Sequence, residues 1–159
     1  EKDNAAQLAV ADSSVVGITM LGLDARYSVS GLRLKGQFYY TSLSNTDQYN
    51  WFTASGGDPN GVGSSMTGYY IAAGYNLFNN SSSIQSELTP FARYEAYNTQ
   101  NTMAEGFSAS PSFDKKAITC GLEWQMARGA LLKADMQFLK SAADDSFSKV
   151  FNAGVGIMF

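Results

Sequence analysis

The sequence predicts an all-β fold, and within that class a transmembrane antiparallel β-barrel. Polar and apolar residues alternate with a period of two over most of the chain, which is typical of strands whose two faces meet different surroundings. The alternating stretches are about 9 to 13 residues long, which suits a tilted crossing of a bilayer. Soluble sheets usually have strands of only about 5 or 6 residues.

Seven strands are expected, with Gly, Asn, Ser and Asp concentrated in the gaps between them. Their expected ranges are 15–28, 32–42, 66–78, 88–98, 116–126, 130–140 and 149–159. The clearest example is "ALLKADMQFLK" (130–140), in which apolar Met136 and Phe138 alternate with Asp135 and Gln137. The same alternation is found in "LRLKGQFYY" (32–40), "ITCGLEWQM" (118–126) and "KVFNAGVGIMF" (149–159).

The connections between these strands alternate in length. Residues 28–31 and 127–129 are tight turns and 79–87 is moderate, whereas 43–65 and 99–115 are long and polar. Short turns on one side and long loops on the other are typical of outer-membrane barrels. Aromatic residues also lie toward strand ends on the apolar faces, where interfacial girdles are expected. They include Tyr27, Tyr40, Tyr69, Tyr75, Trp124 and Phe159.

The last strand resembles the terminal signature of bacterial outer-membrane barrels. Apolar residues occupy alternate positions up to a final phenylalanine, and the resemblance implies recognition by the barrel-assembly machinery. The residues that carry it are Phe151, Val155, Ile157 and Phe159.

The odd strand number has a consequence for domain organisation. We expect one segment over 1–159, with 1–14 as an extracellular loop or short strand and 15–159 as membrane-spanning strands. Bacterial single-chain barrels have even strand numbers. The chain is therefore expected to be about seven C-terminal strands of a larger barrel. The alternative is a complete 8-stranded barrel, in which "NAAQLAVAD" supplies the eighth strand.

Four consecutive stretches resemble the phosphate-selective porin O and P family. They are "MLGLDARYSVSGLRLKGQFYYTSLSNTDQYN" (20–50), "GYYIAAGYNLF" (68–78), "LTPFARYEAYNTQ" (88–100) and "LLKADMQF" (131–138). The resemblance implies the C-terminal portion of a barrel of about 16 to 18 strands that assembles as a homotrimer in the outer membrane. It also implies a preference for anions or phosphate.

Charged residues on the polar faces are candidates for the lining of a pore. Side chains at matching heights on neighbouring strands can pair, so a ladder of opposite charges is expected. Such a wall either sorts hydrated solutes by charge or only maintains strand register. The candidates are Asp24, Arg26, Arg33, Lys35, Arg93, Glu95, Glu123, Lys133 and Asp135.

The composition excludes several classes of function. A net charge of −3 does not favour binding to the negatively charged phosphates of nucleic acid. The chain has no histidine and one cysteine, so the usual parts of catalytic triads and zinc sites are missing. We predict no enzymatic activity, no cofactor and no metal site.

The sequence favours two functions. The first is an outer-membrane porin, a water-filled channel for passive diffusion of small hydrophilic solutes or ions. The second is a structural barrel with a closed lumen, whose loops 43–65 and 99–115 bind a surface protein partner. A soluble lipocalin-like carrier is the third and least favoured interpretation.

Overall fold

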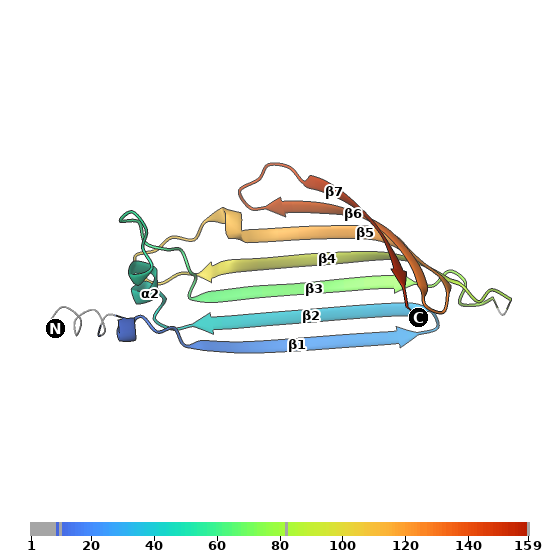
Figure 1. Ribbon diagram of the computed structural model, residues 1–159, viewed down its shortest axis with the longest axis horizontal. Helices are drawn as coiled ribbons and strands as arrows, with labels where there is room; N and C mark the ends of the chain where they lie inside the picture. Colours follow the sequence, from blue (N-terminus) through green and yellow to red (C-terminus); the bar gives the residue numbers. More distant parts are fainter. Residues whose placement is uncertain (1–8, 10, 82, 159) are drawn as a thin grey trace.

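A computed structural model describes residues 9, 11–81 and 83–158. These residues form one antiparallel sheet of seven strands, in which each strand pairs with the next along the chain (Figure 1). The strands are β1 (Ile18–Val29), β2 (Leu32–Leu43), β3 (Ser65–Tyr75), β4 (Glu87–Thr102), β5 (Asp114–Ala127), β6 (Ala130–Ser141) and β7 (Ser148–Ile157). The expected all-β fold and its antiparallel strands are confirmed.

The expected strand boundaries differ from the observed ones by one to four residues at most ends. The third strand stops at Tyr75 because Asn76 begins a turn, in which its side-chain Oδ1 accepts a hydrogen bond from the amide of Phe78 at 3.1 Å. The fourth strand runs on to Thr102. Two short helices inside the long connections were not expected from the sequence. They are α2 (Thr46–Phe52) and the 3-10 helix η1 (Pro111–Phe113).

The segment considered as an eighth strand is only partly described. Within residues 4–12, Ala9, Ala11 and Asp12 have helical backbone, and the other residues lie outside the described part. The described residues of this segment therefore add no strand to the sheet. β1 and β7 are not paired with each other, so the sheet is open.

The connections divide the molecule into two ends. Residues 44–64, 103–113 and 142–147 join strands at one end, which we call the long-loop end, and α2 lies there (Figure 1). The opposite end, the short-turn end, carries connections 30–31, 76–86 and 128–129. The turn at 128–129 is tight because Gly129 adopts a positive φ of 90°, which favours glycine.

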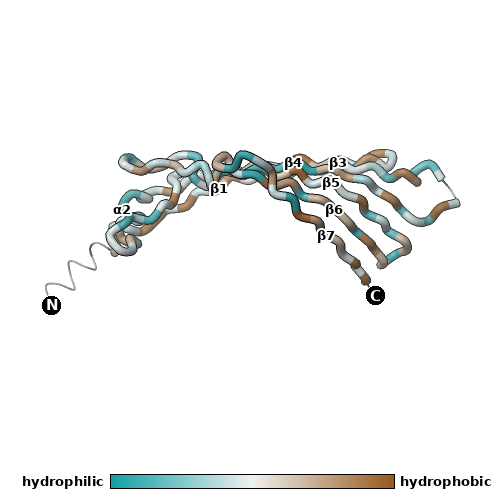
Figure 2. The backbone as a smooth tube through the Cα atoms, turned by 90° about the horizontal axis from the view of Figure 1, so that it is seen from above, coloured by the Kyte–Doolittle hydropathy of each residue, from teal (hydrophilic) through white to brown (hydrophobic). Residues whose placement is uncertain are grey.

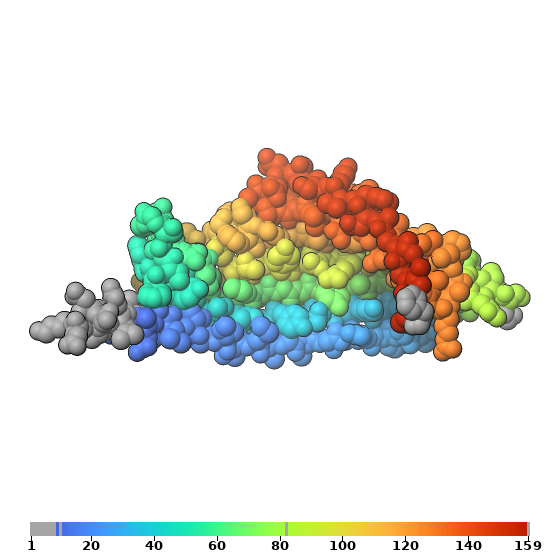
Figure 3. All heavy atoms as spheres, viewed as in Figure 1, coloured from blue at the N-terminus to red at the C-terminus, as the bar shows by residue number. Residues whose placement is uncertain are grey.

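The sheet is strongly curved and has a concave and a convex face. β5 to β7 bend out of the plane of β1 to β4, so the C-terminal end of β7 lies in front of the sheet (Figures 1 and 2). The space-filling view shows the same side, with the red atoms of β7 bending over the sheet (Figure 3).

The two faces carry different side chains. Polar and charged residues dominate the concave face, and large apolar residues dominate the convex face. Large convex residues that are at least a third exposed include Leu23, Phe38, Ile71, Tyr94, Leu122, Trp124, Met136, Phe151, Val155 and Ile157. Among the described residues, the only buried apolar side chains are Ala96 and Ala117. This part of the chain therefore has no hydrophobic core beneath either face.

Candidate functional site

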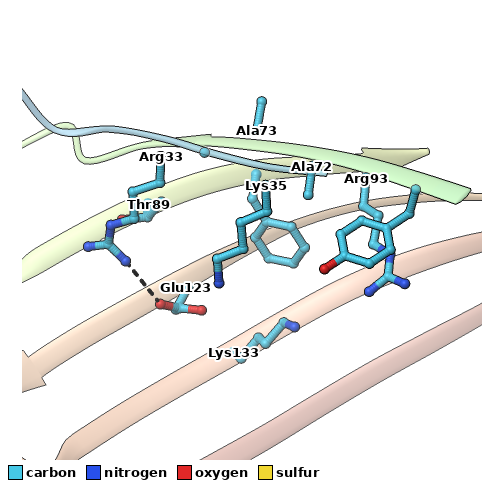
Figure 4. A pocket seen from close by; sticks show the side chains of 11 residues that line it. Arg33, Lys35, Ala72, Ala73, Thr89, Arg93, Glu123 and Lys133 are labelled. Atoms are coloured by element: carbon cyan, nitrogen blue, oxygen red, sulfur yellow. Dashed lines mark ion pairs between the residues drawn. The ribbon is translucent and has the colours of Figure 1, made fainter. Parts of the chain in front are cut away.

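A recess on the concave face gathers charged and aromatic side chains from β2 to β6. Arg33, Lys35 and Arg93 point into the same space as Glu123 and Lys133, whereas Ala73 points away (Figure 4). The other lining residues are Tyr70, Ala72, Gly74, Thr89 and Phe91. We call this set the concave-face cluster.

Strand register brings these residues together. Lys35 is opposite Ala72, and Ala72 is in turn opposite Arg93. The methyl group of Ala72 leaves room between the two long basic side chains, and Gly74 does the same beside Arg33. The recess therefore exists because β3 presents small residues between two strands that carry long ones.

Arg33 forms the longest-range ion pairs of the cluster. Its guanidinium pairs with Glu87 on β4, and Nη1 lies 3.7 Å from Oε1 of Glu123 on β5. Three strand spacings in a flat sheet would separate β2 from β5 by about 14 Å. Sheet curvature toward this face brings the two side chains into contact.

The other ion pairs join residues two positions apart on one strand. Arg93 pairs with Glu95, and Lys133 Nζ lies 3.8 Å from Oδ2 of Asp135. On β1, Arg26 Nε lies 3.4 Å from Oδ1 of Asp24. The expected cross-strand ladder is thus realised only at Arg33, because Arg26, Arg93 and Lys133 pair with an acid on their own strand and Lys35 forms no ion pair with a described residue.

Aromatic rings provide a second set of contacts for the bases. The guanidinium of Arg93 lies 3.9 Å from the ring centre of Tyr70, and Lys133 Nζ lies 4.7 Å from that of Phe91. Cation–π contacts of this kind fix the orientation of a base without neutralising it. The buried Nε of Arg93 has no hydrogen-bond partner in the described structure.

Lys35 differs from the other bases of the cluster. It makes no ion pair with any described residue, and it stands directly opposite Arg26 in the register of β1 and β2. Like charges in directly opposite positions are unfavourable. Lys35 is therefore the base of this cluster whose charge is least compensated.

All nine charged residues proposed from the sequence lie on the concave face. Arg33, Lys35, Arg93, Glu123 and Lys133 line the recess, and Glu95 and Asp135 pair with two of them. Asp24 and Arg26 are on β1, outside the recess. Whether these residues line a pore stays a prediction.

Sequence reasoning missed Glu87, Tyr70, Thr89 and Phe91. Glu87 was placed in the preceding loop because the fourth strand was expected to begin at residue 88. Extending the alternation by one residue would have placed Glu87 on the same face as Thr89. Lys115, which is opposite Tyr97 and Ser141 in the register, is on the same face. With Glu87 included, six bases and five acids on the strands therefore face this side.

The residues of the C-terminal signature are on the other face. Phe151, Val155 and Ile157 are 66%, 69% and 71% exposed on convex β7. Phe159 lies outside the described residues. The alternation predicted for this strand is present, and its role in assembly stays a prediction.

The two long connections are joined to each other. Within the first connection, the fully buried Asn50 donates from Nδ2 to the carbonyl of Val62 at 3.0 Å and accepts from the Val62 amide at 2.9 Å. Gln100 donates to the carbonyl of Gly61 at 2.6 Å and accepts from the amide of Ser110 at 2.7 Å. These side-chain amides hold both loops in a defined arrangement at the long-loop end.

Comparison with known proteins identifies no relative. No protein-family model, no curated protein and no solved structure matches the chain. In the described ranges, no three side chains of metal-ligating type converge on one point, and no helix has the length and apolar character needed to span a membrane. The function is therefore argued from the sheet itself.

Proposed function

We propose that this chain is part of a bacterial outer-membrane β-barrel that forms a water-filled channel for small hydrophilic solutes or ions. The observation that carries the proposal is the contrast between the two faces of the sheet. Large apolar residues are exposed on the convex face of each of the seven strands, while ion pairs occupy the concave face. An extended apolar surface is normally buried against another molecule. For a barrel with a polar lumen, the hydrocarbon of the membrane surrounds this surface.

The same contrast argues against a soluble carrier. A soluble barrel places its apolar residues inside, around a core or an apolar ligand. Here the inside of the curve carries Arg33, Arg93 and Glu123, and the outside carries side chains such as Ile71 and Val155. Curvature and polarity together favour a hydrated interior.

The open sheet requires further strands for this function. Unpaired backbone groups are too costly to expose in hydrocarbon, and the outer edges of β1 and β7 have no partner among the described strands. We infer that other strands of a larger barrel lie between them, as the resemblance to a trimeric porin of about 16 to 18 strands implies. The barrel-assembly machinery would then recognise β7.

Charge selectivity would depend on the least compensated base. The concave face holds six bases and five acids on its strands, and mixed signs give little net field. Lys35 makes no ion pair with a described residue and stands opposite Arg26. We infer a weak preference for anions, phosphate included, that depends on Lys35.

Single-channel recording of the purified full-length protein in a planar bilayer tests the proposal. We expect discrete conductance steps and, in a KCl gradient, a reversal potential on the anion-selective side. Lys35→Gln should move this potential toward zero, because it removes the uncompensated charge. Lys140→Gln, the same charge change on the convex face, should leave it unchanged. Stable insertion without conductance would contradict the channel.

Stable insertion without conductance would favour a structural or partner-binding barrel. One observation supports this second function: the joined loops present Trp51, which is 61% exposed, beside Phe52, which is 51% exposed. The ring of Trp51 makes an edge contact with Phe107 of the other long loop, with centroids 6.3 Å apart. A fixed, exposed aromatic surface is suited to a protein partner.

A further inference from the structure

We propose that three lysines on the convex face bind the phosphorylated headgroup of an anionic membrane lipid. They are Lys116, Lys140 and Lys149, here called the lysine patch, and they come from the three successive strands β5, β6 and β7. The proposal rests on the proposed function, because it requires the convex face to contact lipid. It adds a specific lipid site to that face.

Register places the three lysines side by side. Lys116 and Lys140 are directly opposite each other, and Lys149 is opposite Phe138, two positions from Lys140. Opposite residues of paired antiparallel strands have Cβ atoms about 5 Å apart. The three ammonium groups therefore lie within reach of one headgroup that carries more than one phosphate.

The patch has no ion pair with an acid, and Asp144, which interacts with Lys140 at longer range, offsets only one of its three charges. None of its lysines forms an ion pair with a described residue, whereas Arg33, Arg93 and Lys133 on the concave face all do. Lys140 Nζ donates only to the backbone carbonyl of Asp145, at 3.2 Å.

The carboxylate of Asp144, in the connection between β6 and β7, is hydrogen-bonded to Ser141. One of its oxygens accepts hydrogen bonds from the amide and the hydroxyl of Ser141, both at 2.7 Å. Directly opposed like charges destabilise a strand pair. A patch of this kind is expected to be neutralised by something outside the chain.

The height of the patch suits a membrane interface. Along β5, Lys116 precedes the outward side chains Ile118 and Leu122, which are 37% and 43% exposed. Tyr69 and Tyr94, whose ring centroids are 6.1 Å apart, lie in the same two register rows as the patch. Interfacial tyrosines sit at headgroup level, and lysine stems extend along apolar surface to place the ammonium in the polar layer.

A lipid fits this surface better than free phosphate does. Ile118, Phe138 and Phe151 continue the patch toward mid-strand on the same face, so an acyl chain would lie against them while the headgroup meets the lysines. Each lysine near an anionic lipid surface adds to the attraction. The combination of apolar contact and charge selects a membrane lipid of the leaflet at the long-loop end.

Lipid retention measured by native mass spectrometry tests the proposal. The full-length protein is equilibrated in mixed micelles that hold equal amounts of phosphatidylcholine and cardiolipin, a lipid with two phosphates. We expect the wild type to retain cardiolipin in preference to phosphatidylcholine. In Lys116→Gln/Lys140→Gln this preference should fall roughly 30-fold, from the lost attraction of two lysines. Lys115→Gln/Arg128→Gln removes the same charge outside the patch and should retain it.

Three results would overturn the lipid site. The first two are a wild type that shows no preference for cardiolipin and a control variant that loses the preference as much as the lysine variant does. The third is displacement of cardiolipin by excess inorganic phosphate, which would identify a free-phosphate site. Alkaline extraction of reconstituted vesicles separates this failure from failure of the proposed function. A protein that stays in the membrane without preferring cardiolipin contradicts only the lipid site. A protein that is extracted contradicts both.

Discussion

Arg33 and Lys35 show how strongly the surroundings of one residue can differ from those of its neighbour two positions away. Arg33 contacts two carboxylates, Glu87 and Glu123, which come from two other strands. Lys35 has the small side chain of Ala72 opposite it on β3 and makes no ion pair with a described residue. Two bases on one face of one strand therefore have different roles, one in joining strands and one in setting local charge.

Asp144 supports a prediction about pH at the same scale. Hydrogen bonds from the hydroxyl of Ser141, and then from its amide, lower the pKa of Asp144 below its usual 3.8. A lowered pKa means that the stabilisation is present above the unfolded value and is lost as pH falls through the folded value. As pH falls from 3.8 through the lowered pKa of Asp144, we expect the Ser141 amide to lose protection from hydrogen exchange.

The control for this prediction is Asp144→Asn, which has no titrating carboxylate. In this variant the protection of the Ser141 amide should be low and independent of pH over the same range. Protection in the wild type that stays constant well below the usual pKa of aspartate would show that the turn does not depend on the ionised carboxylate.

Single strands carry the two-faced chemistry of the molecule, and β6 is the clearest case. Leu132, Ala134 and Met136 are on its convex face, and Lys133 and Asp135 are on its concave face. Asp135 is buried and accepts a hydrogen bond from Asn152 of β7 at 2.9 Å. One face of β6 is thus joined to its neighbours by polar contacts and the other is left apolar.

Substitutions on β6 test the assignment of its faces. Met136→Arg would place a charge against hydrocarbon, and we expect it to lower the free energy of unfolding by about 2 to 4 kcal/mol. Gln137→Arg adds the same side chain on the concave face and should have little effect. Urea titrations of both variants, folded in lipid vesicles, give the comparison. Equal stability of the two variants would rule out a lipid-facing convex side.

The whole molecule has two unlike ends in addition to its two faces. Connections with α2 and η1 gather at the long-loop end, and the tight turn at 128–129 is at the short-turn end. In outer-membrane barrels the long loops are extracellular and the short turns periplasmic. The orientation in the membrane is therefore a prediction that follows from the proposed function.

Cysteine labelling on intact cells tests this orientation. The native thiol is first removed by Cys120→Ala, and a single cysteine is then introduced by Ala109→Cys or Arg128→Cys. An impermeant thiol reagent should label the first variant and should label the second only after the outer membrane is opened. Labelling of the Arg128→Cys variant alone on intact cells would reverse the orientation.

The sequence predicted seven strands and the face of each charged candidate because both depend on a period of two. Alternation is a local property: once Lys133 is assigned to one face of its strand, Asp135 and Gln137 share that face. Long polar connections were also evident from the sequence. The helix α2 within one of them was not, because alternation gives no sign that Asn50 of this helix is buried and bonded to Val62, 12 residues further along the same connection.

Tertiary structure decided which side chains meet. Alternation does not predict that Arg33 reaches Glu123 three strands away, because that contact depends on the curvature of the sheet. It also does not predict that Lys116 and Lys140 are directly opposite each other, because that depends on the register across a turn. By itself, the sequence determined the elements and their two-faced character. The curvature and register of the assembled sheet decided which charges are neutralised and which are left for other molecules.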